Sequence, residues 1–133
     1  MTLGIVVTVR NAMLNAIRNA IDAGAGPGTI RGYDGTRPAT GGAATTLLFE
    51  VTCSDPSAPD AAGGVLTFSA ITSDASANAS GNATWCRFVD STGAFVQDGS
   101  VGTSAADLIL NTVVVTAGIE VSCTAATITA GNP

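Results

Sequence analysis

The stretch Trp85–Val96, which reads WCRFVDSTGAFV, contains the clearest structural signal in the chain. Two apolar runs, both with aromatic residues, flank the tetrapeptide Asp90-Ser91-Thr92-Gly93. A four-residue loop that ends in glycine is typical of a type I turn closed by a residue in the left-handed conformation. The stretch therefore predicts a β-hairpin, and it places the middle of the chain in an antiparallel sheet.

Outward from this hairpin, short runs rich in Val, Ile, Thr and aromatic residues recur between turn residues. In the run 47–53, Leu47, Phe49, Val51 and Cys53 alternate with Leu48, Glu50 and Thr52, which is typical of a strand with one wetter face. The run Ile119–Cys123 has the same period. We predict strands near 29–33, 46–53, 64–71, 82–89, 94–98, 106–110, 112–116 and 119–128. Many short strands at regular spacing favour a β-sandwich or jelly-roll-like domain over residues 29–133.

Residues 5–23 have a helical period instead and predict the only helix. Apolar residues recur there at intervals of three and four and would form one stripe: Val6, Val9, Met13, Ile17, Ala20 and Ile21. Arg10, Asn11, Arg18 and Asp22 fall largely outside that stripe, and Arg18 and Asp22 have the spacing of an ion pair along a helix. Gly24 is expected to end the helix, and Gly26-Pro27-Gly28 prevents its continuation. The stripe either covers the sheet of its own domain or docks on a neighbouring subunit.

The composition limits the class of protein. A chain of 133 residues suits one domain, 1–133, with one core. Only 11% of its residues are charged, against about 25% in an average soluble protein. Mean hydropathy is +0.41, but no apolar run approaches the roughly 18 residues of a membrane span, so we expect no membrane association. A surface with so little charge suits permanent association with other proteins.

The residue types present argue against several functions. The chain has no Lys and no His, and its five Arg residues are scattered, so we expect neither nucleic-acid binding nor enzymatic activity. There is no C-x-x-C spacing and no acidic calcium loop, so we expect no metal and no cofactor.

Cys53, Cys86 and Cys123 lie in apolar runs, where a free thiol packs as a small apolar group, as is common in a reducing cytoplasm. Six of the ten acids stand beside Gly, Pro or Ser, which favours turn-capping roles over a catalytic carboxylate pair. The N-terminus lacks a basic region and a continuous apolar region before a small-residue cleavage site, so we expect no secretory signal.

The six aromatic residues are spread over the predicted strands, one or two to each, as core residues are. Most of them are therefore expected in the core, and Tyr33 and Trp85 are the two that we allow at a surface. Arg31 and Arg37 flank Tyr33 in an extended segment, and Arg and Tyr are both enriched at interface hot spots. The candidate interface residues are thus Arg31, Tyr33, Arg37 and Trp85, although the two arginines could equally be solvated residues of a strand edge.

Three further stretches carry a family resemblance. They are the segment Ile30–Ala39 (IRGYDGTRPA), the pair Ala83–Arg87 (ATWCR) and Val101–Thr103 (VGT), and the segment Ile119–Asn132 with its TITAGN ending. With the helix before them, they resemble small virion structural proteins of tailed bacteriophages. The nearest functional match is a capsid decoration, or cement, protein with a β-sandwich or jelly-roll body.

That resemblance implies a protein made in the host bacterial cytoplasm and placed on the capsid surface of the virion. Its implied partners are the major capsid protein, at capsomer junctions, and copies of itself in a dimer or trimer. Two other functions remain open: a tail or head–tail component of the same particle, and a carbohydrate- or receptor-binding β-sandwich displayed on the virion. Exposed, clustered aromatic residues would support the last of these.

Overall fold

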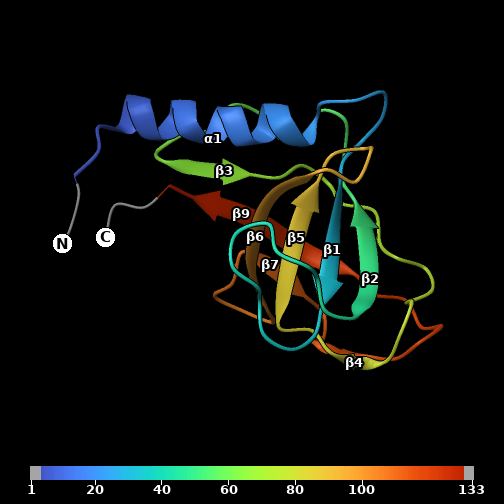
Figure 1. Ribbon diagram of the computed structural model, residues 1–133. Coiled ribbons are helices and arrows are strands. Elements are labelled where there is room, and N and C mark those ends of the chain that lie inside the picture. Colours follow the sequence, from blue (N-terminus) through green and yellow to red (C-terminus); the bar gives the residue numbers. More distant parts are fainter. Residues whose placement is uncertain (1–3, 131–133) are drawn as a thin grey trace.

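The computed structural model describes residues 4–130, and it confirms a mainly β chain with one N-terminal helix (Figure 1). Helix α1 (Val7–Ile21) precedes nine strands: β1 (Thr29–Tyr33), β2 (Leu47–Thr52), β3 (Val65–Thr67), β4 (Gly81–Asn82), β5 (Trp85–Val89), β6 (Phe95–Gly102), β7 (Leu108–Leu110), β8 (Val114–Val115) and β9 (Cys123–Thr129). Seven of these strands form one sheet in the order β2-β1-β5-β6-β7-β9-β3, while β4 and β8 form a separate pair. Within residues 4–130, no helix is long and apolar enough to cross a membrane.

The large sheet is strongly curled, so that β7 and β9 lie behind β1 and β5 (Figure 1). Its concave side encloses the core, to which both ends of the sheet contribute buried residues, among them Ile30, Phe49, Leu66 and Leu108. The rings of Phe88 on β5 and Phe68 after β3 have centroids 5.3 Å apart, so strands at distant places in the sheet meet across this core. A single curled sheet thus supplies both walls of the core.

The predicted hairpin is present between β5 and β6. Its turn is closed by a hydrogen bond from the Gly93 amide to the Asp90 carbonyl at 3.0 Å, and Gly93 has a φ of +85°. The carboxylate of Asp90 accepts hydrogen bonds from the amides of Thr92 and Ala94 at 2.8 and 3.0 Å. Strand β6 continues to Gly102, beyond the predicted end at residue 98.

Several predicted strands are shorter in the structure, because the chain leaves the sheet where other groups satisfy its backbone. The predicted strand 64–71 is reduced to β3, and the amide of Ser69 donates to the Ser57 carbonyl instead of to β9. The predicted strand 119–128 begins only at Cys123. The alternation of its strand predicts the wetter face for Leu48, but Leu48 is fully buried, because the segment around Gly81 packs against its side chain.

Both outer edges of the large sheet are covered. At β2, the amides of Thr72 and Asn78 donate to the carbonyls of Thr52 and Leu48, at 2.8 Å in each bond. At the other end of the sheet, α1 runs alongside β3 (Figure 1). Covered edges leave no free row of backbone groups for unwanted strand pairing.

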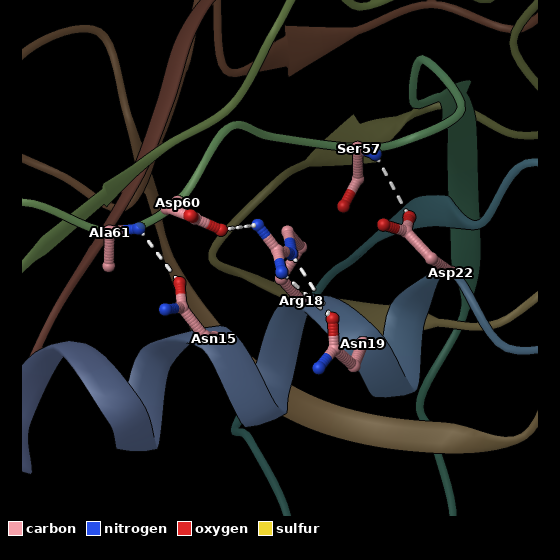
Figure 2. A network of polar contacts seen from close by, with 7 residues as sticks. All are labelled: Asn15, Arg18, Asn19, Asp22, Ser57, Asp60 and Ala61. Carbon is pink, nitrogen blue, oxygen red and sulfur yellow. Dashed lines mark hydrogen bonds and ion pairs between the residues drawn. The ribbon is translucent and has the colours of Figure 1, made fainter.

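Helix α1 packs on its own domain, and it does so largely through polar side chains. The side-chain oxygens of Asn11, Asn15 and Asp22 accept hydrogen bonds from the backbone amides of residues 64, 61 and 57, at 2.8, 2.8 and 2.9 Å. Figure 2 shows the contacts of Asn15 and Asp22 with the segment above the helix. The segment 57–64 therefore runs antiparallel to the helix, and three of its backbone amides are bonded to helix side chains.

The orientation of this helix differs from the predicted one. Leu14 and Ile21 are buried, whereas Val9 and Met13 of the predicted stripe are each 48% exposed. At 3.6 residues per turn, the docked face is rotated from the predicted stripe by more than a third of a turn, and Ile21 is the buried residue that belongs to both. The physical reason is that the segment 57–64 has almost no strand partner, so its amides need acceptors, and the helix supplies them.

The predicted ion pair along the helix is also wrong. Arg18 donates to Asp60 at 2.6 Å, while Asp22 is occupied by the Ser57 amide (Figure 2). Both partners of the predicted pair thus turn toward the segment 57–64 instead of toward each other.

Candidate protein interface

The convex face of the sheet carries a row of four charged residues. In the strand register, Arg31 on β1 lies between Glu50 on β2 and Arg87 on β5, and Arg87 lies beside Asp98 on β6. The two arginines are neighbours and would repel each other. Each is therefore neutralised from its outer side, by Glu50 and Asp98 respectively.

The two ion pairs of this row differ in geometry and burial. Arg31 Nε lies 2.6 Å from Glu50 Oε2, and the two side chains are 33% and 37% exposed. Arg87 makes a two-point contact, with Nε and Nη2 at 2.7 and 3.1 Å from the two carboxylate oxygens of Asp98, and these side chains are only 11% and 7% exposed. The hydrogen bonds that the guanidinium groups donate to Glu50 and Asp98 raise the pKa of both arginines.

Aromatic rings extend this row along the strands. Tyr33 and Trp85 are stacked, with ring centroids 4.5 Å apart and planes inclined by 20°. The guanidinium carbon of Arg87 lies 5.2 Å from the Trp85 ring centroid and 5.0 Å from that of Phe95. Cation–π attraction therefore adds to the ion pair in holding Arg87 in place.

The loop 34–46 covers this part of the sheet and is bonded to it. Arg87 Nη2 donates to the Gly42 carbonyl at 3.0 Å. Trp85 Nε1 donates to the Asp34 carbonyl at 3.0 Å and to Thr45 Oγ1 at 3.2 Å. The loop is thus fastened near both of its ends by side chains from β5.

The four residues predicted as interface candidates come together on this face, but they are not equally accessible. Trp85 and Tyr33 lie beneath the loop, with 2% and 6% of their surface exposed, so they support the surface from below. Arg31 is half-buried in its ion pair. Arg37 is exposed on the loop, and none of the described residues 4–130 forms an ion pair or hydrogen bond with its side chain.

Sequence reasoning missed Phe95, which was placed with the core aromatics but is 39% exposed. The register between β5 and β6 shifts at Phe88/Val89, next to the pair Val89 and Phe95. This irregularity displaces Phe95 from the regular alternation of its strand. No pattern in the sequence marks that bulge, so the exposure of Phe95 could not be predicted.

Arg37 and Phe95 border an open groove of about 430 Å³. One wall of the groove is the loop segment Arg37–Thr40, and the other is the segment Phe95–Asp98 of β6. A second hollow of about 200 Å³, lined in part by Trp85 and Ser100, lies on the other side of Arg37. A free guanidinium and an exposed aromatic ring beside a groove could bind one or two side chains of another protein.

Most acidic residues have a structural role. Five of them accept hydrogen bonds from backbone amides, namely Asp22, Asp34, Asp74, Asp90 and Asp107. Three pair with arginines, namely Glu50, Asp60 and Asp98. Among residues 4–130, no group of three or more acids and cysteines could hold a metal ion.

The three cysteines are free thiols. Burial raises the pKa of Cys53 to about 12 and also raises the pKa of Cys86, which is fully buried. Cys123 is half-buried, and its pKa is raised by burial as well. Burial therefore favours the protonated, less nucleophilic form of all three thiols.

Comparison with known proteins identifies no relative of this chain. No protein-family model, no curated protein and no solved structure matches this chain. The surface around Arg37 and Phe95 is therefore the main feature that points to a function.

Proposed function

We propose that this chain is a non-enzymatic capsid decoration protein of a tailed bacteriophage, which binds the major capsid protein at capsomer junctions through the surface around Arg37 and Phe95. The observation that carries the proposal is an exposed arginine without a partner in residues 4–130, next to an exposed aromatic ring at a groove. Arg and aromatic residues are the types most enriched at hot spots of protein interfaces.

The attachment of the loop supports this role. Trp85 and Arg87 fasten the loop 34–46 to the sheet before any partner binds. Binding then orders little additional chain, so less of the interaction energy is lost to conformational entropy. A fastened loop also presents Arg37 at a defined position, as the repeated sites of a shell require.

The low charge of the chain supports the same proposal. Only 11% of its residues are charged, and most acids already have backbone or arginine partners. Such a surface can be buried against a shell without leaving many unpaired charges in the interface. A protein that binds only where subunits meet in the assembled shell stabilises that shell by mass action.

A carbohydrate-binding face has weaker support. Such a face would present several aromatic rings together. Five of the six aromatic side chains are at most 8% exposed, and Phe95 alone is exposed. A tail or head–tail component would use the same kind of surface as a decoration protein, so position on the particle must distinguish the two.

Cryo-EM of virions that contain this chain tests the proposal directly. We expect many icosahedrally arranged copies at capsomer junctions, with Arg37 and Phe95 facing the capsid protein. Copies confined to the tail or the portal axis, or no copies on the particle, would overturn it.

A paired set of variants tests the surface itself. The double variant R37A/F95S should lower the copy number on purified particles at least tenfold, as measured by quantitative mass spectrometry. The matched control is V114S, which removes a 63% exposed apolar residue from β8 and should leave the copy number unchanged. Full occupancy by the double variant would show that the groove is not the interface.

A further inference from the structure

The outward face of helix α1 is unusually apolar. Seven large apolar side chains are exposed in the described residues, and three of them, Val6, Val9 and Met13, lie on the outward face in the first half of this helix. The side chains that would normally keep an exposed helix face polar are turned toward the domain, since Asn11, Asn15 and Arg18 contact the segment 57–64. A helix that served only to cover its own core would bury its apolar stripe and expose its polar residues.

The spacing of the exposed residues matches another helix. The exposed apolar positions Val6, Val9, Met13, Ala16, Ala20 and Ala23 follow one another at intervals of three, four, three, four and three. An alternation of three and four is the a/d spacing of a coiled-coil seam. The stripe reaches from the residue before α1 to the turn after it and contains no charged residue.

The sizes of these residues identify the partner and its direction. The three larger residues occupy the first half of the stripe, and three alanines occupy the second half. We propose that α1 pairs antiparallel with α1 of a second copy of this chain, about a two-fold axis between Met13 and Ala16. Each larger residue then faces an alanine: Val6 faces Ala23, Val9 faces Ala20, and Met13 faces Ala16. In a parallel pair, the larger residues of the two helices would face each other at one end, and the alanines would face each other at the other end.

Charge and symmetry agree with this partner. The stripe is uncharged, so two copies meet without like charges at the seam, and an isologous contact requires only such a self-complementary patch. Antiparallel alignment also places the positive end of each helix dipole near the negative end of the other. A partner of opposite charge would find no complementary charge along this stripe.

The expected affinity is modest. A helix of 15 residues is about 22 Å long at 1.5 Å per residue. A contact along one such helix is smaller than the roughly 1,600 Å² buried by a standard stable complex. We therefore expect a reversible dimer in the micromolar range. The pairing uses the helix alone and not the Arg37 surface, so either proposal can fail without the other.

Sedimentation velocity of the full chain over a micromolar concentration series tests the pairing. We expect the native protein to shift from monomer to dimer. The variant M13E places two carboxylates beside the two-fold axis and should weaken dimerisation at least tenfold. The control T8E adds the same charge to an exposed position of the same helix outside the stripe, and it should dimerise like the native chain. Circular dichroism verifies that both variants are folded.

Disulfide cross-linking tests the direction. A mixture of V9C and A20C chains should form a mixed disulfide, whereas V9C alone should not, because two copies of residue 9 would be about 16 Å apart along the antiparallel pair. A native chain that stays monomeric throughout the series would overturn the pairing. Equal weakening by M13E and T8E, or rapid cross-linking of V9C to itself, would overturn it as well.

Discussion

Helix α1 and the loop 34–46 both lie on the outside of the sheet, and polar side chains hold both in place, but in opposite senses. In the helix, the docked element supplies the side chains: Asn11, Asn15 and Asp22 accept hydrogen bonds from backbone amides of the domain. In the loop, the sheet supplies them: Trp85 and Arg87 donate to backbone carbonyls of the docked loop.

The difference shows how a chain with few charged residues uses them. Backbone groups of segments without a strand partner need hydrogen-bond partners from elsewhere. Where free backbone amides face the neighbouring element, its acidic and amide side chains accept hydrogen bonds from them. Where free backbone carbonyls face the neighbouring element, its arginine and tryptophan side chains donate hydrogen bonds to them. The contacts under the loop are also more deeply buried, since Arg87 and Asp98 are 11% and 7% exposed, whereas Asp60 at the helix is 81% exposed. Loss of a contact under the loop should therefore cost more stability.

The largest effect is expected at Arg87. Replacing Arg87 by Ala leaves Asp98 as an unpaired charge in a nearly buried site and removes the bond to the Gly42 carbonyl. Loss of one partner of a buried pair typically costs about 3–5 kcal/mol, so we expect a fall of that size in the free energy of unfolding, measured by urea denaturation. The control R31A breaks a half-exposed pair in the same row of the sheet, and it should cost less than about 1 kcal/mol. Equal losses in the two variants would contradict the distinction made from burial.

A smaller effect is expected where the helix is docked. The variant N15A removes the acceptor of the Ala61 amide, which is part-buried. An amide left without a partner costs about 1–3 kcal/mol, partly offset by the better helix propensity of alanine, so we expect a net loss of about 1 kcal/mol. The control N19A changes the same residue type on the exposed side of the helix, where Asn19 accepts only exposed hydrogen bonds from Arg18, and it should stay within about 0.5 kcal/mol of the native chain. Urea denaturation of both variants decides whether Asn15 attaches the helix.

The same contrast explains what the sequence could and could not predict. Local patterns predict three elements: the hairpin at Asp90–Gly93, the strand β1 and the presence of α1. They do so because turn chemistry and apolar periodicity act over a few residues. Local patterns do not predict the orientation of α1, because it is set by the amides of a segment 35 or more residues away in the chain. At the candidate interface, Arg31, Tyr33, Arg37 and Trp85 were predicted from residue type alone. The burial of Trp85 and Tyr33 and the exposure of Phe95 depend on a loop and a bulge that have no local signature.

A weaker effect is expected for the exposed ion pair at the helix. Arg18 lies 2.6 Å from Asp60, whose side chain is 81% exposed. Exposed pairs contribute roughly 0–1 kcal/mol, and salt screens them, so R18A should cost less than about 1 kcal/mol. The difference between R18A and the native chain should shrink in high salt, whereas the cost of N15A should persist. A cost for R18A that does not respond to salt would indicate that the aliphatic part of Arg18, and not its charge, stabilises the helix.

The smallest effect is expected at the hairpin turn, and it depends on pH. The pKa of Asp90 is lowered from its ordinary value of 3.8, first by the hydrogen bond from the Thr92 hydroxyl and next by that from the Ala94 amide. A carboxyl whose pKa is lower in the folded chain than in the unfolded chain adds stability at pH values above its unfolded-state pKa. This contribution is lost as the pH falls through its folded-state pKa.

The variant T92V removes the hydroxyl but keeps the backbone amide, so the pKa of Asp90 should rise toward 3.8. The acid-dependent loss of stability that comes from this carboxyl should then become smaller. Titration of the Asp90 carboxyl carbon by NMR measures the shift, with T8V on the distant helix as a control that should leave it unchanged. If T92V leaves the pKa of Asp90 where it is in the native chain, the backbone amides of the turn hold the carboxylate without the hydroxyl.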